Sequence, residues 1–79
     1  MTTSDSILVQ LAEAKATADA LGEMLRQPAI VIAAFCVDLE IAGHAKSQQI
    51  GDPDKGRKLA LWSITPAGKA RVESLKASV

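Results

Sequence analysis

Hydrophobic residues recur at helical spacing along much of the chain, and the first such stretch lies near the N-terminus. Ile7, Leu11 and Ala14 repeat at intervals of four and three, which places them on one face of a helix. The Ser-Asp-Ser run at residues 4–6 offers side chains that cap a helix N-terminus. The pattern therefore predicts a first helix over about residues 5–14.

A second, shorter helix is indicated after residue 17. Thr17 is an N-cap candidate, and Leu21, Met24 and Leu25 behind it form one apolar stripe. Asp19 places a negative charge in the first turn, where the helix dipole favours it. We expect this helix over about residues 18–25.

A third helix is expected over about residues 28–42, because Pro28 suits a first helical position and Gly43 is a natural stop. This helix has two apolar faces. We expect its core-facing residues to be Ile32, Phe35, Cys36 and Leu39. The opposite face carries a second stripe at intervals of four, three and four: Ile30, Ala34, Val37 and Ile41. Because a helix that is apolar all round is normally buried on both sides, the second stripe needs a partner surface.

After Gly43 the hydrophobic residues no longer recur at helical spacing, and the pattern becomes that of extended strands. Residues 45–50 and 58–64 read as strands, and residues 51–56 between them, Gly-Asp-Pro-Asp-Lys-Gly, are dense in turn formers. This pattern predicts a β-hairpin whose second strand turns Trp62 and Ile64 toward the helices.

A final helix is predicted after the hairpin. Thr65 can cap it and Pro66 suits its first position. Its apolar residues again repeat at intervals of four, three and four: Gly68, Val72, Leu75 and Val79.

Composition narrows the possibilities to one small globular domain over residues 1–79. The chain is 48% hydrophobic and 23% charged, with a net charge of zero. Cys36 is the single cysteine, which excludes an intramolecular disulfide and fits a reduced, cytoplasmic setting. The N-terminus does not resemble a signal peptide, and no apolar run approaches the ~20 residues that span a bilayer, so we expect no membrane association.

The order of these elements resembles the winged helix-turn-helix domains of small bacterial and phage transcriptional regulators. Two fragments carry the resemblance: Leu-Glu-Ile-Ala-Gly at residues 39–43, and a basic strand running into Ile-Thr-Pro-Ala-Gly at residues 64–68. It covers about residues 6–75 and implies an α+β fold and binding to duplex DNA. The third helix would enter the major groove, and the hairpin, or wing, would contact phosphates or the minor groove.

Candidate DNA contacts lie before the third helix and along the wing. They are Arg26, Gln27, Lys46, Lys55, Arg57 and Lys58, with Lys69 and Arg71 just beyond. Lysines can instead protect a solvated hairpin edge from strand pairing, and Asp52 and Asp54 dilute the positive charge. Both interpretations of the wing stay open.

The third helix departs from the resemblance, because reading base edges requires polar side chains and its outer stripe is apolar. The main alternative is therefore a protein-interaction module that uses Ile30, Ala34, Val37 and Ile41 to form a homodimer or bind another protein. Of the two hypotheses, DNA binding by a homodimeric regulator is preferred.

Enzymatic function is not expected. His44 lacks an evident catalytic partner, and Cys36 lies among core residues where a thiol is inert. Asp52 and Asp54 lack the other ligands of a calcium loop. The sequence therefore predicts no catalytic residues, no metal site and no cofactor.

Overall fold

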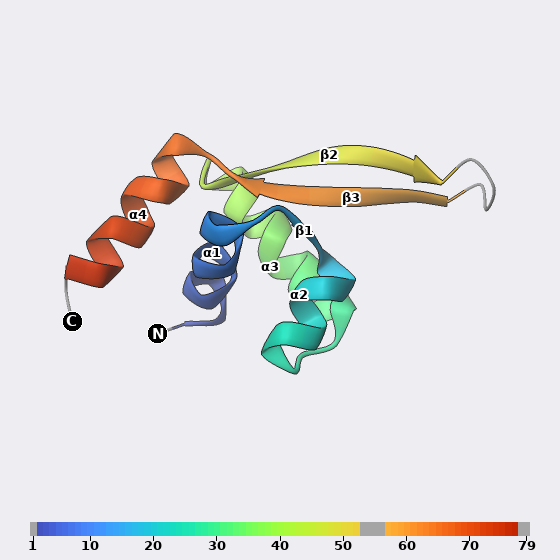
Figure 1. Cartoon of the computed structure of the whole chain (residues 1–79), viewed down its shortest axis with the longest axis horizontal. Helices are drawn as coiled ribbons and strands as arrows, with labels where there is room; N and C mark the ends of the chain where they lie inside the picture. Colours follow the sequence, from blue (N-terminus) through green and yellow to red (C-terminus); the bar gives the residue numbers. More distant parts are fainter. Residues whose placement is uncertain (1, 53–56, 78–79) are drawn as a thin grey trace.

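The computed structural model describes residues 2–52 and 57–77, and these form an α+β domain (Figure 1). Its helices and strands follow the predicted order, with one short strand added. They are α1 (Thr3–Glu13), β1 (Ala16–Thr17), α2 (Ala18–Leu25), α3 (Ala29–Ile41), β2 (Ala45–Asp52), β3 (Arg57–Ile64) and α4 (Pro66–Ala77). The predicted fold class and the predicted helices and hairpin are confirmed.

The sheet is antiparallel, with β3 in the centre and β1 and β2 on its two sides. Strands β2 and β3 form the expected hairpin, here called the wing, which projects beyond the helices (Figure 1). Its register runs from Ala45 opposite Ile64 to Asp52 opposite Arg57. The strands are longer than expected, and the remaining residues of the predicted turn, 53–56, lie outside the described part of the chain.

The helix ends agree with the sequence pattern at α2 and differ at α1 and α3. Thr17 caps α2 as predicted, its Oγ1 accepting a hydrogen bond from the Ala20 N–H at 3.2 Å. The expected capping of the first helix by residues 4–6 is wrong, because α1 begins at Thr3 and the Thr2 Oγ1 accepts from the Asp5 N–H. Pro28 has extended backbone angles and precedes α3 instead of opening it.

The core lies where α1, α2 and α3 meet the base of the wing. Its fully buried side chains are Ile7, Leu8, Leu21, Ile32 and Cys36. The expected inner face of α3 is confirmed, with Leu39 also buried and Phe35 packed at the edge. Trp62 is 6% exposed and Ile64 is partly buried, so the predicted inner face of β3 is confirmed as well.

A compact joint connects the end of α3 to the start of α4. The Thr65 Oγ1 donates to the Gly43 carbonyl at 2.6 Å and accepts from the Gly68 N–H at 3.1 Å, which makes Thr65 the expected cap of α4. The Thr65 N–H also donates to the His44 carbonyl at 3.1 Å. These bonds fix the base of the wing against two helices at once.

Candidate nucleic-acid interface

Helices α2 and α3 meet at 112° across a short turn at residues 26–28. That angle and turn length are typical of a helix-turn-helix motif. The turn folds back on α2, because the Gln27 N–H donates to the Gly22 carbonyl at 2.9 Å. Gly22 allows this approach, since a Cβ there would lie 2.7 Å from the Gln27 carbonyl oxygen.

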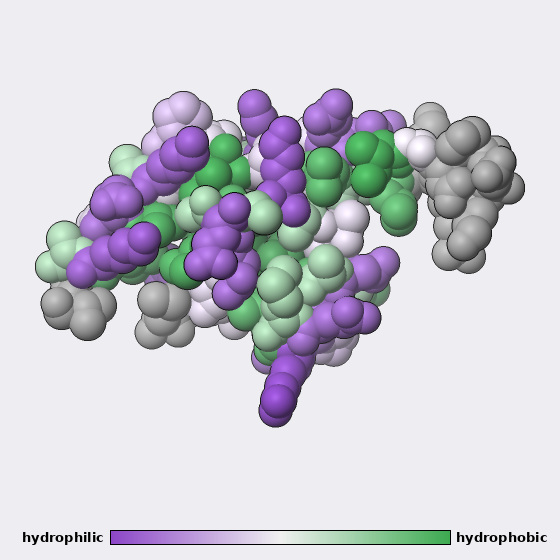
Figure 2. Space-filling model, viewed as in Figure 1, coloured by the Kyte–Doolittle hydropathy of each residue, from purple (hydrophilic) through white to green (hydrophobic). Residues whose placement is uncertain are grey.

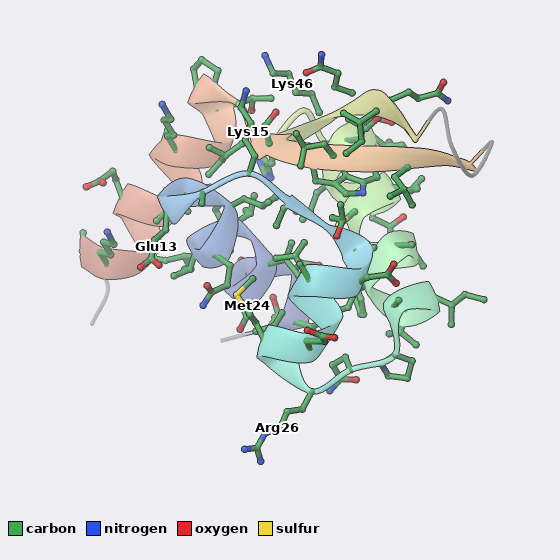
Figure 3. The ribbon with its side chains drawn as sticks, turned by 45° about the vertical axis from the view of Figure 1, so that its right-hand side comes forward. Glu13, Lys15, Met24, Arg26 and Lys46 are labelled. Atoms are coloured by element: carbon green, nitrogen blue, oxygen red, sulfur yellow. The ribbon has the colours of Figure 1, made fainter. Side chains whose placement is uncertain are left out.

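Arg26 occupies the tip of that turn in an unusual backbone conformation. Its φ of 56° and ψ of 44° lie in the left-handed region, which favours glycine and costs an arginine conformational energy. The side chains of Arg26 and Gln27 are both exposed, and Arg26 points away from the helices (Figure 3). Arg26 is the C-cap of α2, where a left-handed residue commonly ends a helix, so its exposed side chain and not its backbone makes it a candidate for binding.

The predicted wing contacts fall at two separate places. Lys46 is exposed near the base of β2, opposite Ser63, whereas Arg57 and Lys58 begin β3 at the far end. At about 3.4 Å per residue these places are about 20 Å apart. Lys55 lies outside the described residues.

The structure therefore does not gather the five predicted DNA contacts that it describes, Arg26, Gln27, Lys46, Arg57 and Lys58, into one patch. Lys46 and Arg26 extend from opposite sides of the molecule (Figure 3). Arg26 is adjacent to Gln27 in the helix-turn-helix, and Arg57 is adjacent to Lys58 in the wing. The predicted contacts thus fall into two separate groups, one at the α2–α3 turn and one along the wing.

Arg71 belongs to neither region. Its guanidinium lies 3.6 Å from the carboxylate of Asp5, a residue that is almost fully buried in α1. The pair joins α1 to α4. The sequence pattern missed this contact because the two residues are far apart along the chain.

The wing also has an exposed apolar pair that the sequence analysis did not single out. Ile50 and Leu59 lie opposite each other in the register, and both are exposed. Figure 2 shows apolar surface toward the far end of the hairpin, beside polar side chains along its upper edge. Only the cross-strand register brings the two residues together.

The outer stripe of α3 is exposed as the sequence pattern predicts. Ile30 is 81% exposed, Ile41 80% and Val37 46%, and Ala34 is exposed between them. A shallow groove beside the stripe is lined by Ile30, Val31, Ala34, Phe35 and Asp38. Along α3, which the structure describes completely, no exposed side chain is a hydrogen-bond donor. The outer face of α3 is therefore apolar and offers no side-chain donor to a base edge.

The buried side chains provide neither a reactive thiol nor a group of metal ligands among the described residues. Burial raises the pKa of the Cys36 thiol from 9.0 to about 11. Within residues 2–52 and 57–77, His, Cys, Asp and Glu side chains do not gather in threes as a metal site requires. No single helix in these ranges has the length and hydropathy to cross a membrane; α2 and α3 meet those limits only together, across their 112° bend.

We expect Cys36 to resist thiol reagents in the folded protein. At pH 8 a pKa near 11 leaves about 100-fold less thiolate than a pKa of 9, and burial also blocks access. Reaction with an aromatic disulfide reagent should thus be at least 100-fold slower in the native protein than in urea. Equal rates in both conditions would contradict the placement of Cys36 in the core.

Solved structures with the same arrangement come from bacterial regulators, although no family model and no curated protein matches the sequence. A Pseudomonas aeruginosa protein described as a probable transcriptional regulator is 34% identical over 99% of this chain, with a TM-score of 0.75. A PadR family transcription regulator from Clostridium difficile is 15% identical over 96% of the chain, with a TM-score of 0.85. The adhesin competence repressor AdcR of Streptococcus pyogenes is 15% identical over 99%, with a TM-score of 0.82.

The chain spans 58% of the Pseudomonas protein, 84% of the PadR family protein and 56% of AdcR. Each comparison covers nearly all of the present chain, including α2, the sharp turn, α3 and the wing. The chain is a winged helix-turn-helix domain similar to those of bacterial transcriptional regulators.

Proposed function

We propose that this chain is the DNA-binding domain of a bacterial or phage transcriptional regulator and that it carries out no catalysis. The observation that carries the proposal is the 112° helix-turn-helix with an exposed cation at its turn and a projecting wing beside it. The similarity to transcriptional regulators supports the same assignment.

The proposed contacts are mainly to phosphates. Arg26 and Gln27 would hold one stretch of DNA backbone at the start of α3, and the wing cations Lys55, Arg57 and Lys58 would hold another. Lys46 would contribute from the base of the wing. Because the exposed face of α3 has no donors for base edges, most of the affinity should be independent of sequence and sensitive to salt.

The test is a fluorescence titration of labelled duplex DNA at two or more salt concentrations. Replacing Lys55, Arg57 and Lys58 by alanine should weaken binding to every duplex tested, because phosphate contacts carry no sequence information. The slope of log affinity against log salt should decrease by about 0.9 for each phosphate that the variant no longer neutralises.

Arg26→Gly provides a second variant in the same titration. Glycine adopts the left-handed conformation without strain, so this change removes the cation and preserves the turn. Circular dichroism should show unchanged helix content while DNA affinity falls. Absence of duplex binding by the wild-type protein at low salt would refute the proposed function.

The second candidate function is a protein contact, in a homodimer or with another protein, through the outer stripe of α3. The exposed Ile30, Val37 and Ile41 favour this candidate, because soluble proteins rarely leave a continuous apolar ridge uncovered. A partner seated there would exclude α3 from DNA, so the two functions are alternatives.

A further inference from the structure

The outer stripe of α3 belongs to the helix that directly follows the turn of the helix-turn-helix. Arg26 and Gln27 are exposed just before this helix, so DNA held at the turn would bring α3 to the major groove. No side chain caps the start of α3 and its first turn has no acidic residue, so the positive end of its dipole would approach phosphates without a competing carboxylate. The apolar stripe is then the surface that meets the base edges.

The chemistry of the stripe selects among the groups that the major groove presents. Every base pair offers hydrogen-bonding atoms there, and an A·T pair adds the C5-methyl group of thymine. The exposed side chains of α3 include no hydrogen-bond donor, so they cannot pair with the acceptors of the base edges. An aliphatic surface gains free energy by burying another apolar group, and in an unmodified duplex the thymine methyl is the apolar group that the groove offers.

The shallow groove beside the stripe has the lining that a methyl group needs. Ile30, Val31, Ala34 and Phe35 supply its aliphatic and aromatic carbon atoms. Ala34 is exposed, and its short side chain leaves the hollow open between longer neighbours. Ile30 and Val31 lie in the first turn of α3, the part of a recognition helix that contacts bases in helix-turn-helix proteins.

Asp38 lines the C-terminal end of the same groove and adds a polar element to the selection. A carboxylate only accepts hydrogen bonds, so it suits the exocyclic amines of adenine and cytosine and repels phosphate. An A·T pair presents both an amine and a methyl group in the major groove, whereas a G·C pair presents an amine without a methyl. Glu40 is directed to β2 instead, because the N–H and hydroxyl of Ser47 donate to its carboxylate at 3.2 and 2.9 Å.

We propose that the outer stripe of α3 and its groove recognise thymine methyl groups, so that the domain prefers duplexes with A·T pairs beneath α3. The inference rests on the proposed DNA binding and adds the class of base pair that the protein selects. Phosphate contacts from Arg26 and the wing hold a duplex of any sequence. The methyl contacts raise the affinity where thymines meet the stripe.

Replacing thymine by uracil in a labelled duplex tests the proposal, because it removes the C5-methyl group and leaves the hydrogen-bonding atoms of the A·T pair in place. The thymine duplex should bind more tightly than its uracil counterpart, by about two- to fourfold for each methyl group that α3 covers. A G·C duplex should gain a similar factor for each covered cytosine that carries a 5-methyl group. Titrations at one fixed salt concentration keep the phosphate contribution constant.

Variants locate the effect on α3. Ile30→Ala should bring the affinity ratio of the thymine and uracil duplexes toward one without unfolding the protein, since Ile30 is exposed. Met24→Ala is the matched control, because Met24 is exposed on α2 outside the stripe, and this variant should keep the wild-type ratio. Arg26→Gly should weaken binding to both duplexes by the same factor.

The outcomes separate this inference from the proposed function. A wild type that binds the thymine and uracil duplexes equally, a methylated G·C duplex that gains nothing, or an Ile30→Ala protein with the full ratio would overturn the methyl recognition and leave DNA binding intact. A wild type that binds no duplex at low salt would refute the proposed function and the inference with it.

Discussion

Replacing Gly68 by alanine is expected to destabilise the domain more than other small changes of its surface. A Cβ at this position would collide with the His44 carbonyl oxygen and would lie 2.7 Å from the Ile64 Cγ1. The carbonyl cannot move away freely, because it accepts a hydrogen bond from the Thr65 N–H. Overpacking commonly costs about 1–3 kcal/mol, and a backbone obstacle should bring the loss to the top of that range or beyond.

That loss is a large share of the stability available to a chain of this size. At roughly 0.05–0.15 kcal/mol per residue, the free energy of unfolding of 79 residues is about 4–12 kcal/mol. Urea unfolding followed by circular dichroism measures the difference. Gly51→Ala is the matched control, because nothing lies within 4 Å of its Cβ position and its φ is not positive. Equal losses for the two variants would mean that α4 does not pack against His44 as the structure shows.

The same joint explains how α4 helps to position the proposed DNA contacts. Thr65 holds the Gly43 carbonyl at the end of α3 and caps α4 through Gly68. Because β3 ends at Ile64, directly before Thr65, the hydrogen bonds of this joint help to set the orientation of the wing relative to α3. A change at Gly68 that leaves some protein folded should therefore also weaken DNA binding through the proposed contacts, although Gly68 makes none itself.

Local signals in the sequence were sufficient for most of the secondary structure. Thr17 and Thr65 were identified as helix caps because a threonine before an apolar repeat satisfies free N–H groups, and both make that bond. The inner face of α3 followed from its spacing. The outer stripe followed from the same argument, and its exposure agrees with it.

The features that were missed depend on contacts between distant segments. Strand β1 has two residues, too few for a periodic signal, and exists only because Ala16 and Thr17 pair with β3. Asp5 looked like a capping residue, but its side chain faces Arg71 on α4. Helix α1 starts two residues earlier than expected, because the Thr2 side chain caps it by accepting a hydrogen bond from the Asp5 N–H.

The sequence could identify candidate DNA contacts, but not where they lie relative to one another. Counting cations along the chain singled out Arg26, Lys46 and Arg57, but their separation follows from the path of the chain. The left-handed conformation of Arg26 could not be anticipated, because a glycine would suit the position better. The outer apolar stripe of α3 could be recognised in the sequence, whereas the shallow groove beside it depends on the fold.

The second large effect is expected at Trp62, the aromatic side chain at the centre of the sheet. Trp62 pairs with Ala16 on β1 and Ser47 on β2, and it is 6% exposed. Truncating a buried tryptophan to alanine typically costs about 3–5 kcal/mol, through reduced apolar burial and the cavity left behind. Trp62→Ala should therefore lower the free energy of unfolding by about 3–5 kcal/mol, a large share of the total stability, and it should loosen β1 together with the wing.

Leu59→Ala separates this packing effect from strand propensity. Leu59 lies on the same strand, but it is 41% exposed toward the far end of the wing. Its truncation should cost about 1 kcal/mol or less, because little apolar surface is uncovered and no cavity forms. Hydrogen exchange adds a spatial readout: in Trp62→Ala the amides of Ala16 and Thr17 should lose protection, whereas in Leu59→Ala they should keep it. If both variants were equally stable, Trp62 would not anchor the sheet, and the helices would have to hold the wing through the joint at Thr65 alone.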